Sequence, residues 1–413
     1  MTRSVIAALN GAWESELVAA VEATAGYTVA RRCADLPDLL AAAAAGYGQV
    51  GLVSADLRAL DRPALHELAS HGVEVAGVVA PGDDMGERRL RQLGLTVVLR
   101  ADLASHEIDD ALDSLASRAS SVVDEVLIPT ADLDEPETIV AAKVIAVWGP
   151  TGAPGRSTVA LNLAAELARS ATTLLVDCDT YGSSVAQSLG LLDEAPGVAA
   201  AARAADQGTL DLAALARIAP EVVPGLRVLT GIPRAERWTE LRAPSVAHLL
   251  TVARQLSRFV VIDCGFAIED DEELSYDTLA PRRNAATLTA LESADDLLVV
   301  GAADPIGLQR LVRAVQDLAA VPSPTPRIVV NRVRASAVGS RPERRIADAL
   351  GRFAGMEDIT YLPWDQVSLD GAMFAGKSLA EFAPQSDLRR AIASLTTSYA
   401  VSAPEQRRRR SRR

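Results

Sequence analysis

The sequence predicts an α/β protein built from two mostly parallel sheets. Three observations support this prediction. Strand-like and helix-like apolar segments alternate along the chain, a loop rich in Gly and Pro joins an apolar strand to a helix, and 49% of the residues are apolar although only 4% are aromatic, so the core should be aliphatic. The 413 residues suffice for two or three domains. We expect one domain at residues 1–118 and another at 143–400.

Composition excludes several classes of protein. The longest apolar runs are broken by charge or Gly well short of the roughly 18 residues that a membrane span needs, and the N-terminus lacks the order of a secretory signal. Cys33, Cys178 and Cys264 have no paired spacing, and the four histidines are scattered. We therefore expect neither a disulfide scaffold nor a zinc site, and a cytoplasmic protein that is at most peripheral at the inner face of the membrane.

The first predicted domain alternates five strand-like with five helix-like segments, which predicts a compact parallel sheet with helices on both faces. The strand-like segments are 5–9, 27–33, 50–54, 73–80 and 96–100, and the helix-like segments are 14–24, 35–45, 63–72, 86–94 and 105–119.

The size and order of these segments resemble a response-regulator receiver domain. In such a domain an acidic pair follows the first strand, but here Leu9 and Asn10 take its place. Ala80 replaces the hydroxyl expected after strand four, and Arg100 replaces the Lys expected after strand five. Asp56 is then either a phosphoacceptor without the carboxylates that would hold Mg²⁺ or a solvated loop residue. We favour the second reading and an interaction platform.

Two segments flank the second predicted domain. Residues 119–142 contain six acidic residues and two prolines without sustained periodicity, which predicts an acidic linker. Six of the last seven residues are Arg and carry a charge of +6. The net charge of the chain is −13, so the rest of it carries −19. We expect residues 401–413 to form a disordered tail that makes weak contact with anionic membrane or nucleic acid.

The stretch VIAVWGPTGAPGRST at 144–158 organises the second domain. An apolar run, a Gly/Pro-rich loop and a segment of helical spacing follow one another, which is the strand, loop and helix order of a P-loop. Such a loop holds phosphate with backbone N–H groups and a helix N-terminus, and it needs a cation and a hydroxyl for Mg²⁺. A plain turn is the alternative.

The spacing departs from the common G-x-x-x-x-G-K-[ST] pattern at Pro150 and Arg156. It fits better the K-G-G-x-G-K-[ST]-[ST] loop of the ParA/MinD family, which this sequence resembles. In that alignment Thr151 replaces the Lys that in the family reaches across a dimer, and Ser157 is the Mg²⁺ ligand. The resemblance implies nucleotide contacts at Gly152, Ala153, Pro154, Gly155, Arg156, Ser157 and Thr158.

Two later strands end in carboxylates. Asp177 and Asp179 are two residues apart, on one face of a predicted strand, and Asp263 follows four apolar residues as in a Walker B segment. The resemblance places Asp177 and Asp263 near Mg²⁺ and Asp179 near the attacking water, so that Asp179 and Arg156 are the catalytic candidates. The alternative is an exposed strand end. The residues after Asp263 depart from the family pattern, so the resemblance does not extend to the loop that senses the γ-phosphate in the family.

The C-terminal third supplies two further matches and one apolar stripe. Asn331 and Arg332 resemble the family's adenine-contacting segment, and Pro363 and Asp365 open its terminal P-x-D motif. Leu388, Ile392, Leu395 and Tyr399 share one helical stripe, which we expect to pack on the sheet instead of inserting into a membrane.

The resemblance covers about residues 143–400. Combined with a degenerate receiver-like domain, it is nearest to the CpaE/TadZ branch and to actinobacterial septum-site-determining proteins. It implies a homodimeric switch that binds ATP and Mg²⁺, with weak or lost hydrolysis, and that positions protein partners of a division or pilus/secretion apparatus. Two alternatives remain: a pseudo-ATPase scaffold that works without nucleotide, and a ParA-like partition protein on nucleic acid.

Overall fold

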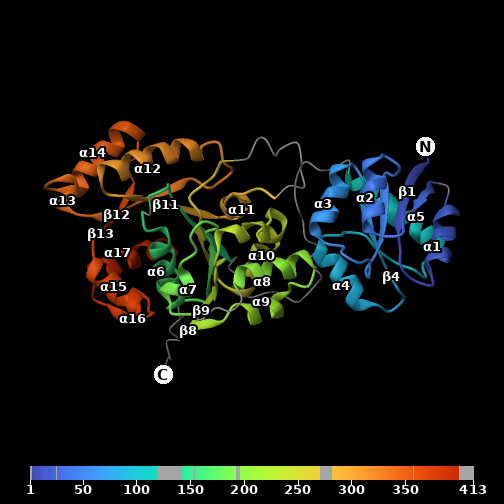
Figure 1. Ribbon diagram of the computed structural model, residues 1–413, viewed down its shortest axis with the longest axis horizontal. Helices are drawn as coiled ribbons and strands as arrows, with labels where there is room; N and C mark the ends of the chain where they lie inside the picture. The colour runs from blue at the N-terminus through green and yellow to red at the C-terminus, as the bar shows by residue number, and fades with distance from the viewer. Residues whose placement is uncertain are drawn as a thin grey trace, which may run out of the picture.

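The computed structural model contains two sheets in series along the chain (Figure 1). It describes residues 2–24, 26–119, 142–152, 154–191, 196–269, 281–356 and 358–399. The predicted linker between residues 119 and 142 and the predicted tail 401–413 lie outside the described residues.

The first sheet is entirely parallel, in the order β2-β1-β3-β4-β5. This is one of the two common orders of doubly wound folds. Its elements are β1 (Arg3–Ala8), α1 (Glu14–Glu22), β2 (Tyr27–Arg32), α2 (Leu36–Ala44), β3 (Val50–Ser54), α3 (Arg62–Ser70), β4 (Glu74–Val79), α4 (Asp84–Leu93), β5 (Val98–Arg100) and α5 (Ser105–Ala119). Every predicted segment is present, so the fold prediction is confirmed and the arrangement is consistent with a receiver-like domain.

Helices cover both faces of this sheet, and the inner strands β1, β3 and β4 are therefore buried on both sides, whereas the edge strand β2 is mostly exposed. One core cluster joins the strands to α2, α3 and α4, and a second joins them to α1 and α5. Local chemistry starts the helices: the carboxylates of Asp35 and Asp61 accept from the N–H groups of Asp38 and Ala64, and a proline follows each cap.

The second sheet has eight strands in the order β13-β12-β11-β6-β10-β7-β9-β8, all parallel except that β8 runs antiparallel to β9. Its strands are β6 (Lys143–Trp148), β7 (Thr173–Cys178), β8 (Glu221–Val223), β9 (Leu226–Leu229), β10 (Phe259–Cys264), β11 (Asp296–Ala302), β12 (Pro326–Val333) and β13 (Ile359–Pro363). Its helices are α6 (Arg156–Ala168), α7 (Val185–Ser188), α8 (Gly197–Asp206), α9 (Leu212–Ile218), η1 (Ala235–Glu240), α10 (Ala243–Leu256), α11 (Ala285–Ser293), α12 (Pro305–Leu318), α13 (Ala335–Val338), α14 (Pro342–Ala354), α15 (Gln366–Phe374), α16 (Leu379–Phe382), α17 (Asp387–Leu395) and η3 (Thr396–Tyr399).

Each face of this sheet has its own buried cluster of apolar residues. Residues of α8, α10, α11, α12 and α14 share one cluster, and residues of α6, α15, α16 and α17 share the other (Figure 1). The second cluster includes the whole C-terminal stripe, and the Tyr399 hydroxyl donates to Asp296 at 2.5 Å. The prediction that this stripe packs on the sheet is confirmed. Among the described helices, none is long and apolar enough to cross a membrane.

Two arginines connect the two sheets' helical layers. Arg62 at the start of α3 donates to the carbonyl oxygen of Ala205 at 3.3 Å, and Arg89 of α4 donates to that of Gln207 at 3.2 Å. Both acceptors lie at the C-terminal end of α8, where free carbonyl groups favour cations.

Candidate functional site

The register of the second sheet brings the predicted loop and carboxylates to one edge. β10 lies between β6 and β7, and Asp263 is paired with Val147 on one side and with Asp177 on the other. Because these strands are parallel, the residues that follow them leave the sheet together. The edge therefore holds the Gly-rich loop directly beside the acidic strand ends.

The loop between β6 and α6 requires glycine. Gly152 and Gly155 have φ angles of 103° and 101°, in the left-handed region that favours glycine. A Cβ on Gly155 would lie 2.4 Å from the Nδ2 atom of Asn331, and one on Gly149 would lie 2.2 Å from the carbonyl oxygen of Val300. Gly155 is also the N-cap of α6 and has no side chain to cover the first N–H groups of the helix, which can therefore face an anion. Ala153 lies outside the described residues.

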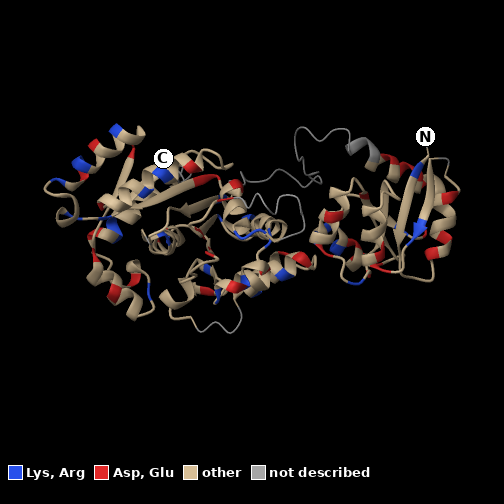
Figure 2. Cartoon of the chain, turned by 45° about the horizontal axis from the view of Figure 1, so that its top comes forward, with Lys and Arg blue, Asp and Glu red and all other residues tan. Residues whose placement is uncertain are grey.

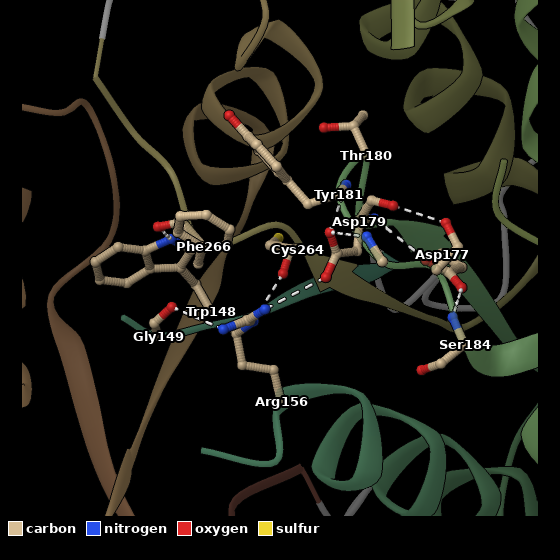
Figure 3. Close-up of polar contacts among 12 residues, drawn as sticks. Trp148, Gly149, Arg156, Asp177, Asp179, Thr180, Tyr181, Ser184, Cys264 and Phe266 are labelled. Atoms are coloured by element: carbon tan, nitrogen blue, oxygen red, sulfur yellow. Dashed lines mark hydrogen bonds and ion pairs between the residues drawn. The ribbon is translucent and has the colours of Figure 1, made fainter. Parts of the chain in front are cut away.

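The Arg156 side chain is folded into the loop (Figure 3). It is 8% exposed, and its guanidinium donates to the carbonyl oxygens of Gly149, Pro150 and Cys264 at 3.3, 3.0 and 3.1 Å. Its Nη2 atom lies 3.3 Å from an Asp179 carboxylate oxygen. The cation predicted to contact phosphate is thus held by loop carbonyls and a buried acid.

Asp179 lies one residue beyond the end of β7, not on the strand as predicted. Its Oδ1 atom accepts from the N–H groups of Tyr181 and Gly182 at 2.8 and 3.1 Å, while Oδ2 faces Arg156. The strand ends here because the carboxylate replaces the ladder with local turn contacts. Both oxygens of the predicted water-orienting base already have partners.

Asp177 is fully buried at the end of β7. Its oxygens accept from the N–H groups of Asp179, Ser184 and Val185, each at 3.2 Å (Figure 3). Burial raises the pKa of Asp177 to about 7, although these N–H groups oppose the shift. This carboxylate shapes the segment that follows β7.

Asp263 differs from its neighbours because neither of its buried oxygens has a hydrogen-bond partner among the described residues. Burial, followed by the charge of Asp177, raises its pKa well above the ordinary value. The Ser157 hydroxyl on α6 comes near enough to lower that pKa without completing a hydrogen bond. A buried carboxylate in this condition is costly, and a cation bound beside it would offset the cost.

These residues fit Mg²⁺ better than a metal ion that takes all of its ligands from protein side chains. In the described ranges no three His, Cys, Asp or Glu side chains are grouped as a metal site. Mg²⁺ is usually held by one or two carboxylates, with the remaining positions taken by water and phosphate oxygens. Asp263 with Ser157 is such a partial ligand set.

The predicted base-binding residues are divided between two places. Asn331 donates through Nδ2 to the carbonyl oxygen of Pro154 at 2.9 Å and so supports the loop. Arg332 adopts a positive φ of 61°, and its guanidinium carbon lies 5.5 Å from the centre of the Trp364 ring. Asp365 caps α15 by accepting from the N–H of Ser368 at 3.1 Å, two residues after Pro363 ends β13.

The comparison with protein families decides the identity of this unit. Residues 145–370, more than half of the chain, match the CobQ/CobB/MinD/ParA nucleotide-binding domain. The chain belongs to this family. A comparison with curated protein sequences found no match to this chain.

Solved structures with a similar fold cover the same part of the chain. One is a ParA family ATPase from Chlorobium tepidum, with 20% identity and a TM-score of 0.52, matching 62% of this chain and 99% of that one. Another is the Pyrococcus furiosus cell division ATPase MinD, with 18% identity and a TM-score of 0.49, matching 63% of this chain and 100% of that one. The first likeness shows that the fold is shared.

Sequence reasoning missed four residues at this edge of the ParA/MinD-type unit. Arg310 of α12 lies 3.5 Å from the carbonyl oxygen of Thr151 and against Gly152. The rings of Tyr181 and Phe266 are in tilted contact with centroids 4.6 Å apart, and the Thr180 hydroxyl is buried with no partner in the described part of the chain. They come from three separate places, namely the turn after β7, the segment after β10 and α12, so no single local motif could have indicated them.

Proposed function

We propose that this CobQ/CobB/MinD/ParA family member is an ATP-binding switch that uses Mg²⁺, forms a homodimer and positions a partner assembly. The observation that carries the proposal is Asp263, a buried carboxylate with both oxygens free, beside Ser157 at the start of the helix that follows a Gly-rich loop. In this proposal residues 143–400 form the ATPase-like domain, and the acidic linker 119–142 joins it to the receiver-like domain 1–118.

Each part of the edge has a separate task in this proposal. The N–H groups at the start of α6 and around Gly152 and Gly155 bind phosphate oxygens. Ser157 and Asp263 would hold Mg²⁺, which supplies neutralisation of phosphate charge when it is bound. Thr158 supplies a second hydroxyl next to Ser157 and contacts the nucleotide. Arg332, Pro363 and Asp365 lie toward the base, and Asn331 keeps the loop in place.

We propose that hydrolysis is slow or absent. Catalysis of phosphoryl transfer depends on cations that stabilise charge developing on the transferred group. Here Thr151 has no charge, and Arg156 is occupied by loop carbonyls and by Asp179. The same contacts favour the second candidate function, a pseudo-ATPase scaffold that retains the fold and works without nucleotide.

The partner assembly is the least direct part of the proposal. A degenerate receiver-like domain before a ParA/MinD-like domain supports a place near the CpaE/TadZ branch or the septum-site-determining proteins, and hence a division or pilus/secretion apparatus in the cytoplasm or at the inner face of the membrane. A nucleic-acid-bound partition protein is less well supported, because Lys and Arg are interspersed with Asp and Glu along the described chain (Figure 2).

Equilibrium binding of ATP and ADP, with and without Mg²⁺, tests the proposal together with a phosphate-release assay. Ser157→Ala should weaken Mg²⁺-ATP about tenfold or more and metal-free ATP little. Thr151→Lys combined with Arg156→Lys should raise any residual hydrolysis. A wild-type protein without affinity even for millimolar ATP would exclude the switch and leave the scaffold.

A further inference from the structure

An apolar groove of about 790 Å³ lies between α12 and α14, which are neighbours at one end of the second sheet (Figure 1). Its floor and walls include Leu308 and Val312 of α12 and Ile346 and Leu350 of α14. This volume is in the range of ligand and peptide sites. The groove lies on a different face of α12 from Arg310, which touches the Gly-rich loop.

The rim of the groove exposes apolar side chains that the described chain does not cover. Phe353 lines it and is 68% exposed, and Ile306, which follows the lining residue Pro305 but does not itself line the groove, is 62% exposed. Large apolar side chains that gather beside a groove commonly mark an interaction surface.

The charge of the groove has one sign. Among the described residues that line it, Arg313 and Arg345 are charged and the others are apolar or Gln. Arg313 makes no ion pair or hydrogen bond with any described residue, and Arg345 donates only to the carbonyl oxygen of Val338, at 3.3 Å. An occupant that supplies carboxylates on both sides of an apolar strip would satisfy both arginines.

The shape of the groove selects among such occupants. Residues 305–316 of α12 and 345–353 of α14 carry its helical lining, so it is about 13 to 18 Å long at a rise of about 1.5 Å per residue. A third helix of about three turns fits a slot of that length, with anchors at positions i, i+3, i+4 and i+7.

We propose that this groove binds an amphipathic helix of a protein partner, with an apolar strip that enters the slot and acidic residues that pair with Arg313 and Arg345. Docking does not require the proposed nucleotide function. Because α12 also carries Arg310 against Thr151, occupancy of the groove bears on the loop as well, and this coupling does rest on the proposed function.

Selection from a random library of displayed helical peptides tests the proposal with the full-length protein as bait. We expect enrichment of acidic peptides with apolar residues at i, i+3, i+4 and i+7. Affinity of a selected peptide, measured by fluorescence anisotropy, should fall at least tenfold in Arg313→Glu/Arg345→Glu and in Phe353→Ser. Arg344→Glu, which is on the same helix but outside the groove, and Phe374→Ser, which is 97% exposed on α15, should change it less than twofold.

Three results would overturn the proposal. The selection could return no binder, it could return peptides that are neutral or basic, or the peptide could bind the two groove variants as well as wild type. Sedimentation of the same proteins addresses a second copy of the chain: a wild-type dimer lost in Phe353→Ser but kept in Phe374→Ser would assign the groove to self-association instead. Circular dichroism of each variant separates loss of binding from loss of folding.

Discussion

The carboxyl edges of the two sheets have similar parallel strands but differ in whether their acidic side chains are exposed or buried. At the first edge Leu9 and Asn10 follow β1, and Asp56 is exposed beside a cavity of about 90 Å³. At the second edge Asp177 and Asp263 are completely buried. An exposed carboxylate costs little, whereas a buried one without partners costs several kcal/mol and persists only where something offsets it. Burial of the acid, more than its presence, distinguishes the two edges.

The largest difference should appear when the arginine of each edge is removed. Arg156→Met would leave Asp179 and three carbonyl oxygens without their buried partner, and we expect a loss of about 3 to 5 kcal/mol in the free energy of unfolding. Arg100 pairs with Asp102 in solvent at 2.6 Å, so Arg100→Met should leave the free energy of unfolding nearly unchanged. Urea denaturation of both variants measures the two values.

Equal losses in the two variants would mean that Arg156 contributes no more than a surface ion pair. Arg156→Lys is the intermediate case, because a single ammonium cannot reach all of the acceptors that the planar guanidinium bridges. It should recover part of the stability.

A second contrast concerns the acids themselves. Asp263→Asn should lower the affinity for Mg²⁺-ATP about 10- to 100-fold, because a buried carboxylate without a hydrogen-bond partner among the described residues is lost. The same change should raise the melting temperature of the nucleotide-free protein, since a neutral amide is less costly to bury. Asp56→Asn should alter neither quantity. Titration calorimetry and thermal unfolding separate the two effects, and an unchanged Mg²⁺ dependence in Asp263→Asn would remove Asp263 from the metal site.

The contrast between the edges also shows how far a sequence can be interpreted. Hydrophobic periodicity located every strand of the first sheet, and the order of motifs placed Gly155 and Asp263 at one edge of the second. It could not show that Arg156 turns back into its own loop, because Cys264 and Asp179, which hold the guanidinium there together with the loop carbonyls, come from distant segments. Nor could it show that Asp365 caps a helix, since a capping aspartate and a ligand look alike in sequence.

The amino edges, unlike the carboxyl edges, are built alike, and matched variants should behave alike. Tyr399 donates to Asp296 and accepts from Arg327, and Tyr27 of the first sheet donates to Asp113 at 2.9 Å. Each Tyr→Phe change should cost about 1.5 to 2 kcal/mol of unfolding free energy, as for a hydrogen bond to a charged group. Hydrogen exchange of the two sheets measures each loss separately. A loss confined to one sheet would break the likeness.

The smallest effect is expected where the two units meet. His248 of α10 donates to the carbonyl oxygen of Leu210 at 3.2 Å, and burial, followed by the charge of Arg62 from the first unit, lowers its pKa below the ordinary value of 6.5. A histidine with a lowered folded pKa stays neutral in the native state, whereas the unfolded chain binds a proton below pH 6.5. Its contribution to stability is therefore present above that pH and is lost as the pH falls through about 6.5 toward the lowered folded value.

One proton supplies at most about 1.4 kcal/mol per pH unit, so the change in the free energy of unfolding should be a fraction of that. We expect the free energy of unfolding in urea to depend less on pH between 5 and 7 in His248→Gln than in wild type, and His66→Gln, which changes an exposed histidine of α3, is the control for loss of a surface imidazole. If His248→Gln keeps the wild-type slope, the contact between the units does not hold His248 neutral.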